Sequence, residues 1–237
     1  MMCNGLRGIG GLYELIEELL HLPSKQPLHP SQMKFVEAQL DESLEMLDLI
    51  GAVRDCMVAV REHVLDLRSA LRVKGKTINV STKKVHKLIK DCRRSLKQMA
   101  NKPVTCFVAN NESDLLLKAL VEAREGTMSL LQSIMSFFSK PKQKATMWWI
   151  ISKANSKRRI ACVGESENMT EEEIADMWFQ ASYDCITFKD VDASQSVMAQ
   201  NQLETLETRV ESLDSGLYCL FRRLIQHRVS LLNLLSL

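Results

Sequence analysis

Turn-forming residues are scarce in this sequence: of 237 residues, only nine are glycine and five are proline. A β-sandwich or β-barrel needs a turn about every 8 to 12 residues, so this scarcity argues against both architectures. Long helices joined by few connections fit the composition better. No apolar run approaches the roughly 18 residues that a membrane-spanning helix requires. Since no secretory signal is present either, we expect a cytoplasmic protein.

Spacings typical of metal or catalytic sites are also missing. The seven cysteines include no C-x-x-C pair, and their odd number and scatter argue against a zinc site or a disulfide framework. The five histidines lie far apart, and no glycine-rich phosphate loop follows a strand. We therefore expect no enzymatic activity, no metal, no cofactor and no small-molecule substrate.

A heptad pattern of apolar residues is the clearest signal that the chain does contain. Spacings of three and four alternate along this seam, which comprises Leu203, Leu206, Val210, Leu213, Leu217, Leu220 and Leu224. The pattern predicts a helix over residues 202–237 whose apolar edge is either part of the core or bound by a partner. A second row widens the stripe, which predicts several neighbours for this helix: Phe221, Ile225, Leu232 and Leu235. His227 interrupts the seam, and we expect it to be a polar residue near a fraying helix end.

Apolar periodicity elsewhere predicts an elongated all-α bundle that forms one domain over residues 1–237. The expected divisions are a short N-terminal helix and proline-rich connector in 1–30, long helices in 31–138, a basic and then acidic middle segment in 139–201, and the heptad helix in 202–237. Within the first division, a glycine-rich start should precede a helix from Leu12 to Leu20. In the longest helix, Gly51 predicts a bend or a close helix crossing.

Charge is segregated along the chain, although the net charge is only +2. Residues 74–102 carry ten basic side chains and one acidic, whereas residues 165–214 carry two basic and thirteen acidic. Helical spacing places seven of these cations on one face: Lys83, Lys84, Lys87, Lys90, Arg93, Arg94 and Lys97. Because this segment has no aromatic residue for base stacking, we do not expect it to bind nucleic acid. We expect the cationic face to pair with the acidic block or to face solvent.

A pair of tryptophans lies among basic residues in KPKQKATMWWIISKANSKRR, residues 140–159. The residues that carry this pattern are Lys142, Lys144, Trp148, Trp149, Arg158 and Arg159. Indole rings between cations are typical of a helix that lies in a membrane interface. The alternative, which we favour, is that the two tryptophans are anchors of the core.

Four segments resemble the plant-specific BYPASS-related family. They are GLYELIEELLHLP, LDLIGAVRDCMVAVREHVLDLRSALR, SKRRIACVGE and LFRRLIQHRVSLLNLLS, of which the last is the most specific. The resemblance covers almost the whole chain. It implies a helical plant protein without an assigned enzymatic activity, in a family associated with root and shoot development, and it supplies no catalytic residue. Family members usually begin with a Ser- and Pro-rich lead-in, whereas here only about eleven residues precede Leu12.

Two functional hypotheses follow. In the first, a non-enzymatic helical protein binds a protein partner along its heptad seam or associates with itself. In the second, a peripheral membrane protein uses residues 140–159 as a basic aromatic patch.

Overall fold

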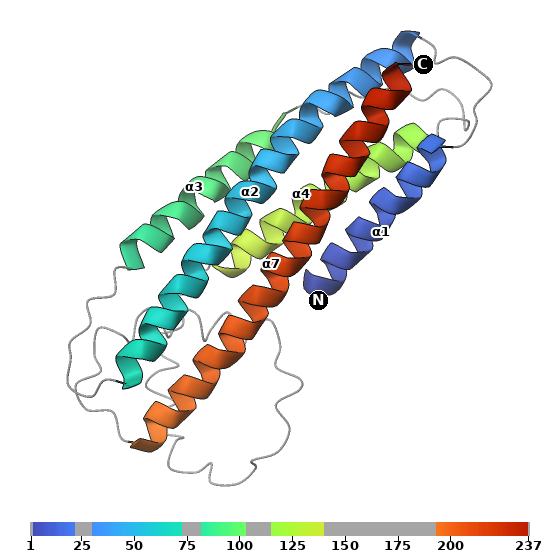
Figure 1. Ribbon diagram of the computed structural model, residues 1–237. Coiled ribbons are helices and arrows are strands. Elements are labelled where there is room, and N and C mark those ends of the chain that lie inside the picture. The colour runs from blue at the N-terminus through green and yellow to red at the C-terminus, as the bar shows by residue number, and fades with distance from the viewer. Residues whose placement is uncertain (1, 22–29, 73–81, 103–114, 140–192, 237) are drawn as a thin grey trace.

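The computed structural model describes residues 2–21, 30–72, 82–102, 115–139 and 193–236. These residues form helices α1 (Met2–His21), α2 (Pro30–Arg72), α3 (Thr82–Ala100), α4 (Leu115–Phe137) and α7 (Ala193–Leu235) (Figure 1). No strand occurs among them, so the prediction of an all-α bundle is confirmed. None of the described helices is both long and apolar enough to span a membrane.

Helices α2 and α7 form the spine of the molecule. Each contains 43 residues, or about 65 Å of helix, and the two run side by side in opposite directions (Figure 1). Ion pairs connect them at three levels: Arg54 with Asp214, Arg61 with Glu211, and Arg68 with Glu207. Because the three arginines are spaced by seven residues, they lie in one row along α2. This charge zipper fixes the register of the antiparallel pair.

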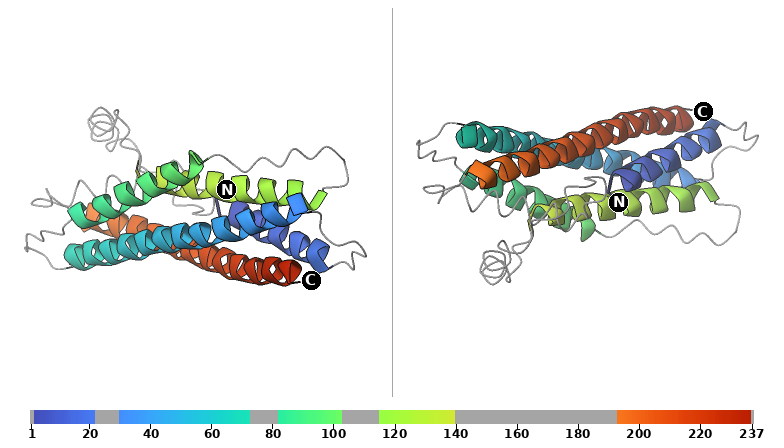
Figure 2. Two further views of the ribbon diagram at one scale, coloured as in Figure 1. Left: turned by 90° about the horizontal axis from the view of Figure 1, so that it is seen from above. Right: turned by 90° about the horizontal axis from the view of Figure 1, so that it is seen from below.

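The other described helices pack on this spine. Helices α3 and α4 form a second layer against it, and α1 lies beside α7 and α4 (Figure 2). Antiparallel neighbours are the rule, but α1 runs parallel to α7, since Leu6 lies against Gly216 and Glu14 pairs with Arg223 further along both helices. All five helices contribute side chains to one hydrophobic core.

Helix α1 begins ten residues earlier than the sequence predicted, at Met2 instead of Leu12. Its glycine-rich start is helical because Leu6 and Ile9 pack into notches on two neighbouring helices. A Cβ atom on Gly216 of α7 would lie 2.8 Å from Leu6 Cδ1, and one on Gly126 of α4 would lie 2.6 Å from Ile9 Cδ1. Tertiary packing thus overrides the low helix propensity of glycine.

Close helix crossings therefore occur at Gly126 and Gly216. Of the two roles expected for Gly51, a bend or a close helix crossing, the second is wrong. No atom lies within 4 Å of a Cβ built on Gly51. That glycine lies mid-helix with open space beside it, so its missing side chain serves no packing purpose.

Candidate functional site

The heptad seam lies inside the molecule. All seven of its residues are at most 5 % exposed, and α7 packs along α2 and α1. His227 continues the seam between Leu224 and Leu231 and is itself only 4 % exposed, so the expectation of a polar residue near a fraying end is wrong. Since the chain's own helices cover the seam, a partner of the folded protein has to bind a different surface.

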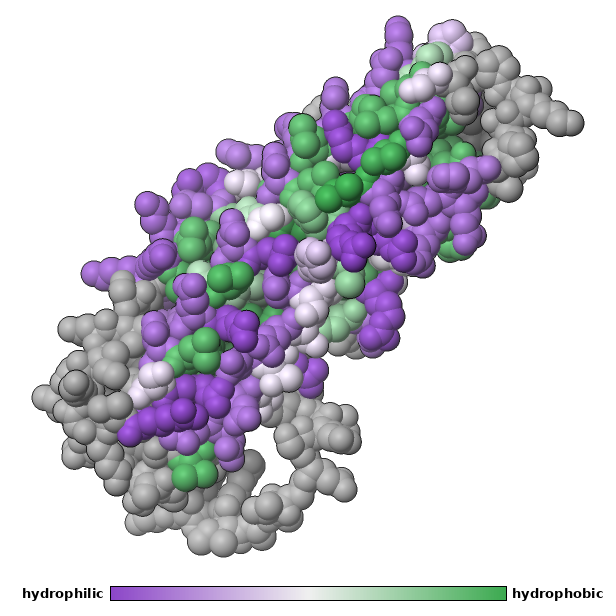
Figure 3. Space-filling view, viewed as in Figure 1, coloured by the Kyte–Doolittle hydropathy of each residue, from purple (hydrophilic) through white to green (hydrophobic). Residues whose placement is uncertain are grey.

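The outer face of the spine carries an apolar strip, which we define as Leu44 of α2 with Ile225, Val229 and Leu232 of α7. Their exposed fractions are 51 %, 43 %, 51 % and 44 %. Figure 3 shows hydrophobic residues gathered where the first half of α2 lies beside the second half of α7. The second row of α7 was expected to pack against neighbouring helices. Phe221 and Leu235 are partly buried against the core, as expected. The expectation is wrong for Ile225 and Leu232, which are exposed.

Hydrogen bonds of Arg228 hold the two halves of the apolar strip together. Its guanidinium donates to the carbonyl of Leu40 and, at 2.9 Å, to Ser43 Oγ. These bonds place the α2 turn that carries Leu44 beside the α7 turn that carries Val229. The strip is therefore one surface built from two helices.

An acidic row follows the apolar strip along α2. Its members recur every seven residues, are exposed and form no ion pair among the described residues: Asp41, Asp48, Asp55 and Glu62. Residues with this spacing share one side of a helix, and the row lies next to the row of Leu44, Val58 and Leu65. Apolar and negatively charged side chains thus run side by side on the outer face of α2.

The cationic face of α3 is exposed to solvent. All seven of its basic residues are at least partly accessible, and within the described chain the one ion pair they make is between Arg94 and Asp91, at 3.3 Å on the same helix. Of the two outcomes expected for this face, exposure to solvent is the one observed, and pairing does not occur with the described acids of the acidic block, which are Glu204, Glu207, Glu211 and Asp214. These carboxylates are occupied by the arginines of α2. Residues 165–192 lie outside the described residues.

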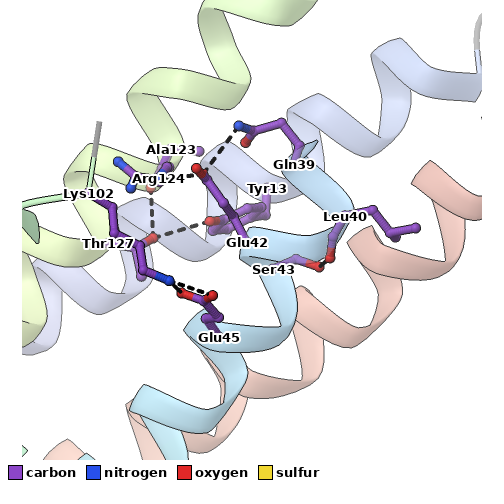
Figure 4. Close-up of polar contacts among 10 residues, drawn as sticks. All are labelled: Tyr13, Gln39, Leu40, Glu42, Ser43, Glu45, Lys102, Ala123, Arg124 and Thr127. Carbon is purple, nitrogen blue, oxygen red and sulfur yellow. Dashed lines mark hydrogen bonds and ion pairs between the residues drawn. The ribbon is translucent and has the colours of Figure 1, made fainter. Parts of the chain in front are cut away.

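A second candidate site lies where α1, α2, α4 and α7 meet, and we call it the junction pocket. It is a cavity of about 20 Å³, partly open to solvent, with room for about one water molecule. Its polar lining comes from all four helices and comprises Tyr13, Gln39, Glu42, Ser43, Arg124 and His227. The side chains of α2 and α4 that point toward one another here are shown in Figure 4.

An ion pair forms one wall of the junction pocket. Arg124 Nε lies 2.7 Å from Glu42 Oε2, and Gln39 Nε2 donates to the same oxygen at 3.4 Å. Opposite them, Tyr13 Oη lies 3.3 Å from Thr127 Oγ1. Because the Thr127 hydroxyl already donates to the carbonyl of Ala123 at 2.7 Å, the phenol must be the donor. The Tyr13 ring also contacts the His227 ring, with 5.2 Å between centroids.

Burial keeps both ring residues of the junction pocket neutral near pH 7. It raises the pKa of Tyr13 to about 12, against smaller lowering effects of Thr127 and Arg124. It also lowers the pKa of His227 to about 4. A general base works best when its pKa is near the working pH, so neither group is set up for proton transfer at neutral pH.

The sequence analysis missed the junction pocket, although the chain contains a signal for it. Arg124 and Thr127 occupy stripe positions of α4 between the buried residues Leu120 and Leu131. A charged residue within an apolar stripe indicates a buried partner of opposite charge. The pattern does not say that the partner is Glu42, because residues 82 positions apart meet only in the folded chain.

Other predicted features fall partly or wholly outside the described residues. The basic aromatic patch, with Lys142, Lys144, Trp148, Trp149, Arg158 and Arg159, lies entirely outside them. Within the described ranges, no group of three or more His, Cys, Asp or Glu side chains is arranged to hold a metal ion.

Comparison with known proteins identifies the family. No curated protein and no solved structure matches the chain. A family model described as Protein BPS1 matches residues 5–234, which include all of α2, α3 and α4 and nearly all of α1 and α7. The chain therefore belongs to the BPS1 family, the BYPASS-related family that its sequence resembles.

Proposed function

We propose that this protein is a non-enzymatic binding protein of plant development, and that it engages a protein partner through the apolar strip. Membership of the BPS1 family supports the developmental role. The observation that supports binding is the strip itself, where four large apolar side chains are 43 % to 51 % exposed. A contiguous apolar surface with a polar rim is typical of a protein interaction site.

The partner that fits this surface is an amphipathic helix with basic flanks. Ile225, Val229 and Leu232 are spaced as the anchors of helix-to-helix recognition are, and Leu44 adds apolar surface from the adjacent helix. The acidic row beside the strip has no cationic partner among the described residues. Lysines or arginines along one edge of the incoming helix would complement it.

The cationic face of α3 on a second copy of the chain fits the apolar strip and the acidic row less well than such a helix does. Helix α3 supplies the complementary charge, but none of its described side chains is an exposed large hydrophobic residue. It would leave the apolar strip unfilled.

The test measures binding of a fluorescent 18-residue peptide designed with a leucine edge flanked by lysines, beside a peptide of the same composition in scrambled order. In the double variant Val229→Lys, Leu232→Lys the new charges repel the basic flanks and remove apolar surface. We expect its affinity for the designed peptide to fall about tenfold or more, or about 1.4 kcal/mol. Both positions are about half exposed, so the variant should fold.

The matched control is the double variant Leu15→Lys, Leu115→Lys, which adds the same two charges to α1 and α4 at residues that are 57 % and 64 % exposed. It should bind as the unaltered protein does. Equal affinity of all three proteins, or equal binding of the scrambled peptide, would overturn the proposal. Light scattering adds a further check, because a dimer that the double variant abolishes would mean that a second copy occupies the strip.

A second candidate function, peripheral membrane binding, draws support from the cationic face of α3. Six accessible cations on one helix face have no carboxylate partner among the described residues, and such a face suits a surface of anionic lipid, at about 1 kcal/mol each. The test is cosedimentation with vesicles containing phosphatidylserine. Binding should weaken in Lys87→Glu, Lys90→Glu if α3 contributes and in Trp148→Ala, Trp149→Ala if residues 140–159 contribute. Vesicle binding that neither variant weakens would remove this candidate.

A further inference from the structure

Three buried polar atoms in the junction pocket make no hydrogen bond among the described residues: Arg124 Nε, Arg124 Nη2 and His227 Nδ1. Arg124 Nε still lies 2.7 Å from Glu42 Oε2 as an ion pair, so the two atoms without any partner are Arg124 Nη2, on a side chain that is 8 % exposed, and His227 Nδ1, on a residue that is 4 % exposed. Both residues line the cavity. A buried donor without an acceptor is costly, more so when it is charged. The pocket therefore lacks at least one acceptor.

The charges around the pocket favour an anionic acceptor over a neutral one. Among the described residues that line it, Arg124 is the cation and Glu42 the carboxylate. Arg228 places a second cation next to the pocket, because it donates a hydrogen bond to Ser43, which lines the cavity. In the described chain this arginine has no carboxylate partner. Tyr13 and His227 stay neutral at pH 7. The surroundings thus carry one positive charge in excess.

The size of the pocket limits what can enter. A cavity of about 20 Å³ holds a group about as large as a water molecule. Because the cavity is partly open, a carboxylate can place one oxygen inside it and leave the rest of the molecule toward solvent. A chloride ion, only slightly larger than a water molecule, can likewise reach in through the open side. Sulfate carries two charges against the single positive charge in excess, so it matches the pocket less well.

The geometry points to a binding site for a small monovalent anion, a carboxylate or a halide, seated between Arg124 Nη2 and His227 Nδ1. Arg124 donates from Nη2 while its Nε stays paired with Glu42. The neutral imidazole donates from Nδ1 in the tautomer that carries its proton there, and an anion at this position favours that tautomer. The anion would join α4 to α7 at the point where α1 and α2 also meet, so binding it stabilises the folded state.

Nuclear magnetic resonance of the full-length labelled protein tests this inference. Sodium formate and sodium chloride separately replace sodium sulfate at constant ionic strength, with sulfate as a doubly charged reference anion that does not match the single positive charge in excess. We expect formate, chloride or both to shift the signals of the Arg124 guanidinium and the His227 ring until they saturate. The anion that saturates at the lower concentration shows whether the pocket prefers a planar carboxylate or a spherical ion.

Three variants separate specific binding from a general salt effect. Arg124→Lys keeps the charge but lacks Nη2, and His227→Phe keeps a ring against Tyr13 but lacks Nδ1. In each, the half-saturating concentration should rise about tenfold or more. Arg94→Lys, on the exposed face of α3, should leave it unchanged. Shifts that never saturate, or that saturate equally in the two pocket variants, would mean that the cavity holds only water and would overturn the inference.

Discussion

At the scale of single residues, the described mid-helix glycines are of two kinds. Some leave room for a side chain of a neighbouring helix, and others have open space beside them. A Cβ on Gly216 would lie 2.8 Å from Leu6 Cδ1 and 3.3 Å from Leu6 Cβ, so Gly216→Ala should push α1 away from α7 and cost about 1 to 3 kcal/mol. Gly51→Ala meets no atom within 4 Å and should stabilise the protein by up to about 1 kcal/mol through helix propensity. Urea denaturation measures both changes, and equal effects would contradict the assignment of helix crossings.

His227 should make stability depend on pH below about 6.5. Its pKa in the folded state is about 4, below the ordinary value of 6.5, so the unfolded chain takes up a proton that the folded chain does not. Stability should therefore fall between pH 6.5 and pH 4, by roughly 3 kcal/mol in total, with no further loss from this group below pH 4. Above pH 6.5 the ring is neutral in both states and contributes nothing.

His227→Phe is the comparison that isolates this effect. Tyr13, Glu42 and Arg124 surround the ring in both proteins, and Glu17 on α1 has a raised pKa in both, so their contributions cancel in the difference. Urea midpoints at pH 7, 5.5 and 4 should converge or cross for the two proteins as pH rises. Parallel curves would show that folding does not shift the pKa of His227.

At the scale of elements, the buried edge of α7 should control stability. Leu213 is 5 % exposed and Leu217 is fully buried, so either substitution by alanine should cost about 2 to 5 kcal/mol. Val197→Ala on the same helix is the control, because Val197 is 58 % exposed and its loss should change the free energy of unfolding by less than about 0.5 kcal/mol. A loss below about 0.5 kcal/mol at both leucines would mean that this edge is not core.

The charge zipper should contribute unequally along its length. Arg68 and Glu207 are 21 % and 15 % exposed, whereas Arg61 and Glu211 are 48 % and 46 % exposed. Solvent screens the second pair more, so a double-mutant cycle with alanine should give about 1 kcal/mol of coupling for the first pair and about 0.3 kcal/mol or less for the second. The reverse order would indicate that the spine has a different register.

Sequence patterns predict the features that lie within one helix and miss those that depend on contacts between helices. The seam, the long helix α2 and the cationic face of α3 follow from periodicity within one segment. Helices α2 and α3 begin and end close to where the pattern predicts, whereas α7 begins at Ala193, nine residues before the predicted start at 202. The start of α1 could not be found that way, because it depends on Gly126 and Gly216 more than 100 residues further along the chain. The junction pocket and the apolar strip depend likewise on which helix becomes the neighbour of which, and no spacing within one helix encodes that.

At the scale of the whole molecule, α7 is the element that the others share. It packs along α2 and α1, and it supplies eight of the core residues besides His227, from Leu203 to Leu231. A chain that ends at Asn201 should therefore lose cooperative unfolding and most of its helical circular dichroism, while the intact 27.0 kDa chain melts in one transition. A truncated chain that stays folded would make α7 a separable interaction device instead.

The position of α7 in the sequence has a consequence for how the protein is made. The first helix of the chain packs parallel to the last, and α2 depends on that same last helix for most of its apolar edge. During translation, α1, α2 and α4 leave the ribosome before α7, so the surfaces that α7 covers stay exposed until it follows. The bundle can therefore complete its folding only after α7 has been made, and until then the nascent chain exposes the apolar helical faces that α7 later covers.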